Sequence, residues 1–252
     1  MLLICDIGNS RIKTGFFIDK KISGIKTFRN IESVMKFIST KNIDETVVSS
    51  VVPDKLKKFI KLYKYHFKHN PVTINKSSKF NLRIAYETPA TLGIDRICSM
   101  EGAFYLYRLK NDSINYDKNT LILSIDFGTA TTINITKYNR IFTGGLIAPG
   151  IEMMFETLEN NTAQLPRVKL PDYKNLIGNS TKTSIASGVI NSTIGLIYQT
   201  INHLKQNNDA KIIIYVTGGN AGYLLPYLNF DYIFEEGLVL YGIKAVYENT
   251  MK

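Results

Sequence analysis

The chain contains 252 residues, of which 44% are hydrophobic and 21% are charged. These fractions are typical of globular proteins and exclude fibrous and intrinsically disordered classes. The length suffices for two domains of about 125 residues each. No uninterrupted apolar stretch approaches the roughly 18 residues of a membrane span, and Asp6 interrupts the apolar run that a signal peptide would need. We therefore expect a soluble cytoplasmic protein.

The chain is strongly basic, with a net charge of +10 and a pI near 9.4. Such a charge attracts either nucleic acid or a small anionic substrate, and composition does not separate the two. The most basic segment is KLKKFIKLYKYHFKH at 55–69, where apolar residues recur at helical spacing. This pattern predicts an amphipathic helix with a solvated outer face; the alternative is a nucleic-acid or membrane surface. We expect neither nucleic acid nor a membrane as partner.

Strand and helix patterns alternate in the first half, which predicts an α/β layered domain. An apolar strand from Leu2 leads through a turn into a second strand that ends near Ile18, so a hairpin is expected. The other elements expected in this half are a helix at Ile31–Ile38, a strand at Thr46–Val52, a helix at Leu56–His69, a strand at Val72–Ile74 and a helix that begins near Thr91 or Leu92. This last helix would carry Asp95 in its first turn.

The polar segment Lys110–Lys118 predicts a boundary between a domain at 1–117 and a domain at 118–252. The elements expected after it are strands at Leu121–Ile125 and Thr131–Thr136, a glycine-rich connection FTGGLIAPG, a helix at Met153–Leu158, an irregular stretch at 162–180, a helix at Thr183–Leu204, a strand at Ile212–Thr217, a helix after the glycine turn at 217–220 and a closing helix at Glu236–Val246. Both cysteines, Cys5 and Cys98, lack metal-ligand spacing and are expected to be small buried side chains.

One short pattern occurs twice, 120 positions apart: LLICDIGNS at 2–10 and LILSIDFGTA at 121–130. Each copy is a buried strand that ends in Asp-x-Gly and a small polar residue. The glycine lets backbone N–H groups approach an anion, and the carboxylates of Asp6 and Asp126 can hold a cation beside it. The duplication favours a site for a nucleotide polyphosphate with its metal over the alternative, two ordinary strands with polar turns.

The phosphates of such a nucleotide would be held without the usual signatures, because GxxxxGK(S/T), GxGxxG and GxSxG are all absent. The first turn offers backbone and side-chain donors, and Lys13 adds a charge that can reach a terminal phosphate. The second turn at 128–131 offers matching donors. Gly218 and Gly219 would let an adenosine lie against the backbone, although a Gly-Gly pair is also an ordinary turn.

Asp95 in GIDR at 93–96 is the candidate general base. A carboxylate beside an arginine in the first turn of a helix is ionised at neutral pH, and it can accept a hydroxyl proton during phosphoryl transfer. The alternative is an aspartate that only complements the helix dipole. These residues alone do not separate the two roles.

Taken in order, the motifs resemble the type III pantothenate kinases over residues 2 to about 245. The motifs that carry this resemblance are DIGNS with Lys13, Tyr86 seven residues before GIDR, DFGTATT, IAPGI, Leu165 with Pro166, Thr181 seven residues before Gly188, and TGG at 217–219. The resemblance implies an α/β fold of two ribonuclease H-like halves, as in acetate and sugar kinases, heat-shock ATPases and actin. It also implies ATP-dependent phosphorylation of pantothenate, the first step of coenzyme A synthesis.

The family pattern, carried over by position, also implies roles for individual residues. The first phosphate loop would be formed by Asp6, Ile7, Gly8, Asn9, Ser10, Arg11, Ile12 and Lys13. The pantothenate pocket would be lined by Tyr86, Gly93, Ile94, Asp95, Arg96 and Thr181. Asp6 would lie on the magnesium side, Asp126 would bind a monovalent cation such as potassium or ammonium, and Thr129 would contact ATP. The family often has Thr where this chain has Ser10, and both offer a hydroxyl.

The resemblance further implies a homodimer in which Thr181 completes the pocket of the other subunit. The helix that follows carries a broad apolar surface, which could serve its own core or a twofold interface. Two other functions are compatible with the same pattern: a transcriptional regulator related to the Bvg accessory factor, and a structural actin-like ATPase. The presence of Asp6, Asp95 and Asp126 favours catalysis.

Overall fold

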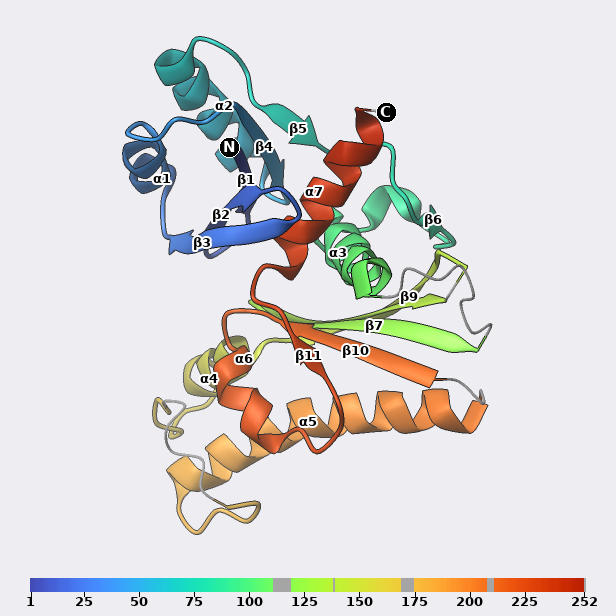
Figure 1. The fold of residues 1–252 in the computed structure, drawn as a ribbon. Helices are drawn as coiled ribbons and strands as arrows, with labels where there is room; N and C mark the ends of the chain where they lie inside the picture. The colour runs from blue at the N-terminus through green and yellow to red at the C-terminus, as the bar shows by residue number, and fades with distance from the viewer. Residues whose placement is uncertain (111–118, 138, 169–174, 208–210, 252) are drawn as a thin grey trace. The chain divides into compact units, whose positions relative to one another are not determined.

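The computed structural model describes residues 1–110, 119–137, 139–168, 175–207 and 211–251 (Figure 1). Contacts within the chain divide it into two units. The first comprises Met1–Tyr116, Thr136–Gly144 and Gly237–Lys252, and the second Asp117–Ile135 and Gly145–Glu236. The domain boundary expected in Lys110–Lys118 falls, apart from Lys110, outside the described residues. The C-terminal segment groups with the first unit, whereas the sequence pattern placed it in the second.

The first unit contains a five-stranded sheet in the order β3-β2-β1-β4-β5. Its strands are β1 (Leu2–Ile7), β2 (Ile12–Ile18), β3 (Lys21–Phe28), β4 (Glu45–Ser50) and β5 (Val72–Ile74). β1 pairs antiparallel with β2, which confirms the hairpin, and parallel with β4. Leu3, Ile4 and Cys5 have no exposed surface, as expected for a central strand covered on both faces.

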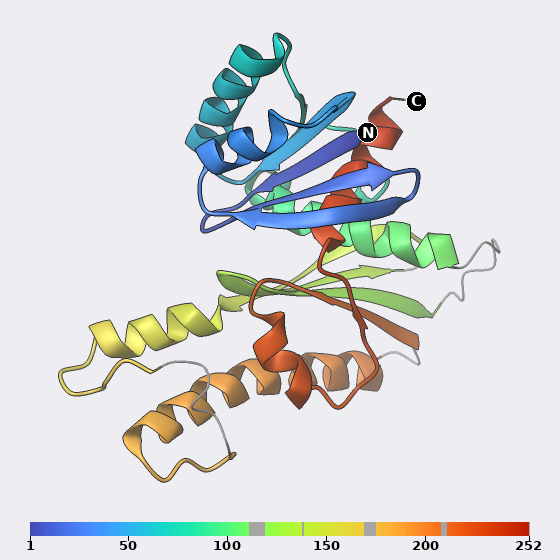
Figure 2. The same ribbon diagram turned by 60° about the vertical axis from the view of Figure 1, so that its left-hand side comes forward.

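Helices α1 (Ile31–Ile38) and α2 (Pro53–Phe67) cover one face of this sheet (Figure 2). Phe59 and Tyr63 of α2 are buried in the core, while Lys57 and Lys58 are exposed. The spacing of three to four residues between apolar positions places them on one helix face. The expected amphipathic helix is therefore confirmed for the basic segment.

The other face is covered by α3 (Ile94–Lys110) and α7 (Leu238–Thr250), which cross at very close range. A Cβ atom on Gly102 of α3 would lie 2.0 Å from the Leu238 carbonyl oxygen, and one on Gly242 of α7 would lie 1.7 Å from the Cys98 carbonyl oxygen. Only glycine permits this backbone contact. The pair of glycines therefore fixes α3, the helix that carries Asp95, on the closing helix.

The second unit is built on the same plan. Its strands are β7 (Thr120–Phe127), β8 (Ala130–Lys137), β9 (Ile141–Pro149), β10 (Lys211–Thr217) and β11 (Ile233–Phe234), in the order β9-β8-β7-β10-β11. Counted within each half, both sheets run third-second-first-fourth-fifth strand. This repeated order confirms the predicted fold class of two ribonuclease H-like halves. A short strand, β6 (Arg83–Ile84), pairs in parallel with Ile141 and Phe142 of β9 within the first unit.

The core of the second unit lies between its sheet and α5 (Thr181–Asn207), as Figure 1 shows. Leu123 and Ile125 of β7 are buried in one cluster with Val189 and Ile197 of α5. The remaining elements of the structure are α4 (Ile151–Asn160), α6 (Ala221–Leu224) and the 3₁₀ turns at Pro89–Thr91 and Leu225–Tyr227. None of the described helices combines the length and apolarity needed to cross a membrane.

Four strands were not expected from the sequence: β3, β6, β9 and β11. The glycine-rich connection forms most of β9. Gly145, with φ +154°, lets this strand pass very close to β8, because a Cβ atom at position 145 would lie 1.8 Å from the Ile133 carbonyl oxygen. β3 is an edge strand whose residues are mostly exposed, so it lacks the apolar alternation that identifies a strand.

Candidate active site

The first candidate phosphate loop is the two-residue hairpin loop between β1 and β2. The Gly8 N–H donates to the Arg11 carbonyl at 3.0 Å, and this bond closes a loop that consists of Asn9 and Ser10. Asn9, Ser10 and Arg11 are exposed, so their donors can reach a ligand. Ile7 and Ile12 have no exposed surface. Within the predicted loop, these two can contribute through their main chain only.

Two side chains from the neighbouring strand and helix brace this loop. The Ser50 hydroxyl at the end of β4 donates to the Ile7 carbonyl at 2.9 Å. The Lys55 ammonium, in the first turn of α2, donates to the carbonyls of Gly8, at 3.2 Å, and Asn9. Both carbonyls are thereby turned toward the lysine, which fixes the conformation of the loop.

Sequence reasoning missed Lys55. It lies 46 positions after Asn9 and resembles the other lysines of the basic helix. The signal that could have found it is indirect: parallel pairing of β1 with β4 brings the ends of both strands to one edge, and α2 starts just after β4. The residues that follow β4 therefore lie beside the loop that follows β1.

Asp6 lies directly opposite Lys13 in the β1–β2 ladder. Directly opposed residues of an antiparallel pair project on the same face with their Cβ atoms about 4.5–5.5 Å apart. The ladder therefore brings the Asp6 carboxylate and the Lys13 ammonium together on one face. Both side chains are partly exposed.

Asp95 occupies the first turn of α3, as expected, and its Oδ1 accepts the backbone N–H of Arg96 at 2.8 Å. The carboxylate folds back over Gly93, where a Cβ atom would lie 2.4 Å from Oδ1. Any side chain at position 93 would displace the carboxylate. Gly93 thus has a specific role in the GIDR motif, which is to leave room for the candidate base.

Both cysteines are buried, as expected. Burial raises the pKa of the Cys98 thiol well above its usual value, and the charges of Asp6, Glu101 and Asp95 raise it further. Burial and, to a smaller extent, the charge of Asp6 also raise the pKa of Cys5. The charges of Asp6 and Asp95 thus both act on the same buried thiol.

Arg96 is 6% exposed and lies beside two aromatic rings. Its guanidinium carbon is 5.9 Å from the ring centroid of Tyr86 and 5.9 Å from that of Phe142. The Tyr86 ring also packs against Gly144, where a Cβ atom would lie 3.4 Å from the ring. The structure therefore brings together Tyr86 and Arg96, and the aromatic rings hold the guanidinium in place. Phe142 was not predicted, because only the β6–β9 pairing brings it here.

The second Asp-x-Gly turn lies in the second unit and is shorter. The Gly128 N–H donates to the Ala130 carbonyl at 3.2 Å, so Thr129 alone spans the turn and is exposed. The Thr129 carbonyl accepts the N–H of Gly150 at 3.1 Å, at the start of α4. Asp126 is the penultimate residue of β7 and lies opposite Thr217 of β10.

Gly218 has a structural role in this unit. Its φ is +108°, and a Cβ atom would lie 2.4 Å from the Phe127 backbone nitrogen. The next loop residues close on the same turn, since the Asn220 N–H donates to the Phe127 carbonyl at 2.9 Å. Because Gly218 has no side chain, its loop can pass close to β7. Packing alone therefore explains the glycine at this position, without a bound adenosine. Gly219 is exposed.

Thr181 is the first residue of α5 and is exposed. It lines a cavity of about 920 Å³ between α4 and α5, whose apolar walls include Met154, Leu158, Ile185 and Val189. The cavity is large enough for a small molecule or for side chains of a partner.

Metal ligands from the protein are sparse. Among the residues that the structure describes, no three His, Cys, Asp or Glu side chains gather into a metal site. Single carboxylates at strand ends suit magnesium, which is usually held by one or two carboxylates together with substrate phosphates and water. The residues present thus fit a metal that binds with the nucleotide.

The repeated five-strand order and the strand-end aspartates define an α/β protein of the acetate-and-sugar-kinase, heat-shock ATPase and actin class. The sequence model described as type III pantothenate kinase matches residues 2–203. The chain belongs to the type III pantothenate kinase family.

Individual relatives agree along the whole chain. The type III pantothenate kinase of Sulfurihydrogenibium sp. (strain YO3AOP1) is 34% identical and covers 96% of this chain and 98% of its own. That of Thermosipho africanus is 34% identical, with 99% of each chain covered. Among solved structures, a putative Baf family transcriptional activator from Campylobacter jejuni shares the fold at a TM-score of 0.57 and 23% identity, over 98% of this chain and 97% of that one.

Proposed function

We infer that this chain transfers the terminal phosphate of ATP to pantothenate and forms 4'-phosphopantothenate, the first step of coenzyme A biosynthesis. The observation that carries this conclusion is the arrangement around GIDR: the Asp95 carboxylate lies over Gly93, and the next residue, Arg96, lies beside the rings of Tyr86 and Phe142. A base next to an anion-binding guanidinium matches a substrate with a hydroxyl at one end and a carboxylate at the other.

In the proposed reaction, the N–H groups of the first loop and the Lys13 ammonium hold the phosphates of ATP. Asp95 accepts the proton of the pantothenate hydroxyl while its oxygen bonds to the terminal phosphorus, and the bond from that phosphorus to ADP breaks. Asp6 would hold magnesium, which neutralises phosphate charge when bound. Arg96 binds the carboxylate of pantothenate.

The direct test is incubation of the purified chain with ATP and pantothenate, with a sugar and no acceptor as controls. We expect ADP and 4'-phosphopantothenate in equal amounts only when pantothenate is present. ADP formation without an acceptor would favour an actin-like ATPase. Specific DNA binding without turnover would favour the regulator related to the Bvg accessory factor.

We further propose that the active unit is a homodimer in the cytoplasm, in which Thr181 completes the pantothenate pocket of the other subunit. The support is the apolar cavity along α4 and α5, which has Thr181 on its lining. Such a surface suits an isologous contact with a second copy.

This shared pocket makes a specific claim about mixtures. Asp95→Asn and Thr181→Arg subunits, each inactive alone, should regain activity when mixed, because one pocket of the heterodimer then has both an intact base and an intact threonine. Mixing each variant with itself is the control. No recovery after confirmed subunit exchange, or a monomeric mass for fully active enzyme, would reject the shared pocket.

A further inference from the structure

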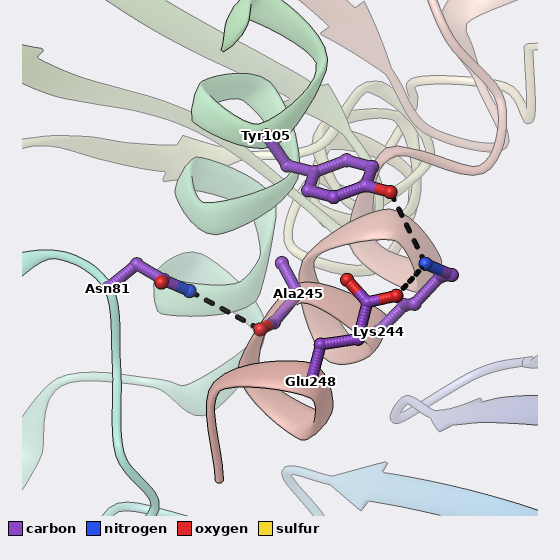
Figure 3. A network of polar contacts seen from close by, with 5 residues as sticks. All are labelled: Asn81, Tyr105, Lys244, Ala245 and Glu248. Atoms are coloured by element: carbon purple, nitrogen blue, oxygen red, sulfur yellow. Dashed lines mark hydrogen bonds and ion pairs between the residues drawn. The ribbon is translucent and has the colours of Figure 1, made fainter. Parts of the chain in front are cut away.

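A second cavity, of about 340 Å³, lies in the first unit between the C-terminal parts of α3 and α7. Its lining includes Tyr105, Arg108 and Leu109 of α3, Glu248 of α7, and Lys20 from the turn between β2 and β3. Figure 3 shows the polar network on its α7 side. Tyr105 lies ten residues after Asp95 on α3, which is about 15 Å along the helix. The proposed reaction uses none of these residues.

The carboxylates at this cavity are already bonded. Glu101, only 1% exposed, accepts the N–H groups of Asn81, at 2.7 Å, and Leu82, at 2.9 Å. It also accepts the side-chain amide of Asn81 at 3.0 Å. Glu248 forms an ion pair with the buried Lys244, whose ammonium also donates to the Tyr105 hydroxyl at 3.2 Å (Figure 3). Neither carboxylate therefore calls for a cationic ligand.

The cations at its mouth are different. Lys20 and Arg108 are both exposed. Within the described part of the chain, neither takes part in an ion pair. Two positive charges on the lining of one cavity attract an anion, and the guanidinium can bind a carboxylate or phosphate through two parallel hydrogen bonds.

Part of the cavity wall is apolar, next to the amides of Asn81 and Asn249. Phe104 is buried beneath it, Leu109 is 38% exposed beside it, and the Tyr105 ring stacks on Tyr241 at a centroid distance of 6.1 Å. The volume lies near the lower end of the range of about 300–1,000 Å³ for small-molecule sites. These features suit a ligand with one anionic group and a compact apolar body.

We propose that this cavity is a binding site for a small organic anion, a carboxylate or phosphate monoester whose charged group lies between Lys20 and Arg108 and whose apolar body packs on Tyr105 and Leu109. The proposal rests on the geometry of the first unit alone and does not depend on the reaction inferred above.

The test is ligand-observed saturation-transfer NMR on the full chain with benzoate and phenyl phosphate as anionic probes and benzyl alcohol as the neutral analogue. ADP and pantothenate are left out because they are anions themselves and would compete for the cavity; the variants described below separate binding in the cavity from binding in the proposed active site. We expect both anions to bind, and benzyl alcohol to bind at least about tenfold more weakly, since a charge-assisted hydrogen bond contributes that much.

The variant that tests the cavity is Lys20→Gln with Arg108→Gln, for which we expect about a tenfold loss of anion binding. The matched control is Lys61→Gln with Lys64→Gln, which removes the same charge from exposed positions of α2 and should leave binding unchanged. Circular dichroism checks that both variants fold. Equal binding of benzyl alcohol, equal losses in the two double variants, or no binding of either anion would overturn the proposal.

Discussion

The two Asp-x-Gly turns begin from the same strand pattern but are stabilised in different ways. In the first unit, Gly8 and Arg11 close a loop of two exposed residues, which the Lys55 ammonium and the Ser50 hydroxyl brace from outside. In the second unit, Thr129 alone spans the turn. The N–H of Gly150 bonds to Thr129, the N–H of Asn220 bonds to Phe127, and the side-chain amide of Asn220 donates to the Gly128 carbonyl at 3.5 Å.

This difference indicates a division of labour between the two units. The first turn offers more donors, and Lys13 lies opposite Asp6, so it suits a highly charged polyphosphate with its divalent cation. The second turn has one carboxylate at its strand end, opposite the neutral Thr217. It suits a weakly held single charge. If this assignment is right, substitutions in the first unit should have the larger effects.

The largest effect is expected for Asp95→Asn in the first unit. The amide keeps the shape of the side chain but cannot accept the hydroxyl proton, so kcat should fall by roughly 10² to 10⁴ while the melting temperature stays the same. The matched control is Asp54→Asn, because Asp54 also lies in the first turn of a helix and is exposed. Equal small losses in both variants would mean that Asp95 only complements the helix dipole.

Gly93→Ala should lower kcat by about 10², since a misplaced catalytic group costs that much. The new Cβ atom would lie 2.4 Å from Oδ1 of Asp95, which can rotate away, so the cost should fall on turnover rather than on stability. Gly195→Ala is the control, because a Cβ atom there meets nothing within 4 Å. A large loss of stability in Gly93→Ala with normal turnover of the folded fraction would contradict the positioning role.

Lys55→Met should raise the KM for ATP by about tenfold and leave the KM for pantothenate unchanged. The variant removes the charge-assisted hydrogen bonds that hold the Gly8 and Asn9 carbonyls, each of which contributes about 1.5–3 kcal/mol. Lys55→Arg should restore part of the affinity, and Lys57→Met on the exposed face of α2 is the control. Steady-state kinetics with each substrate varied separately would measure the difference. An unchanged KM for ATP would remove Lys55 from the site.

Local patterns were sufficient for the elements that form a buried face. The helix at Ile31–Ile38 and the strand at Val72–Ile74 have the expected bounds, because apolar periodicity and a capping Asn30 mark them. The first turn of α3 was also predictable, and with it the place of Asp95.

What the sequence did not indicate depends on contacts between distant segments. Lys55 is a site residue only because β1 and β4 pair, and Phe142 only because β6 and β9 pair. The closing helix joins the first unit because Gly242 meets Cys98, 144 positions earlier, without an intervening side chain. Local sequence propensities do not indicate contacts between distant segments. The glycines of GIDR and TGG could therefore be recognised as motif residues, but their packing roles could not be predicted.

The smallest effect is expected in the second unit, for Asp126→Ala. We propose that this carboxylate binds potassium or ammonium, so activity should be severalfold higher in potassium or ammonium than in sodium, and Asp126→Ala should abolish that difference while keeping some turnover. A cation site made of a single carboxylate with carbonyl and water ligands binds its ion weakly and selects the ion by size rather than by charge. Rates measured in buffers of equal ionic strength provide the test, with Asp6→Ala as the contrast. Asp6→Ala should weaken the magnesium dependence and preserve the preference for potassium. Equal rates of the unaltered enzyme in sodium and potassium, or a potassium preference that survives in Asp126→Ala, would show that the two turns do not divide the cations in this way.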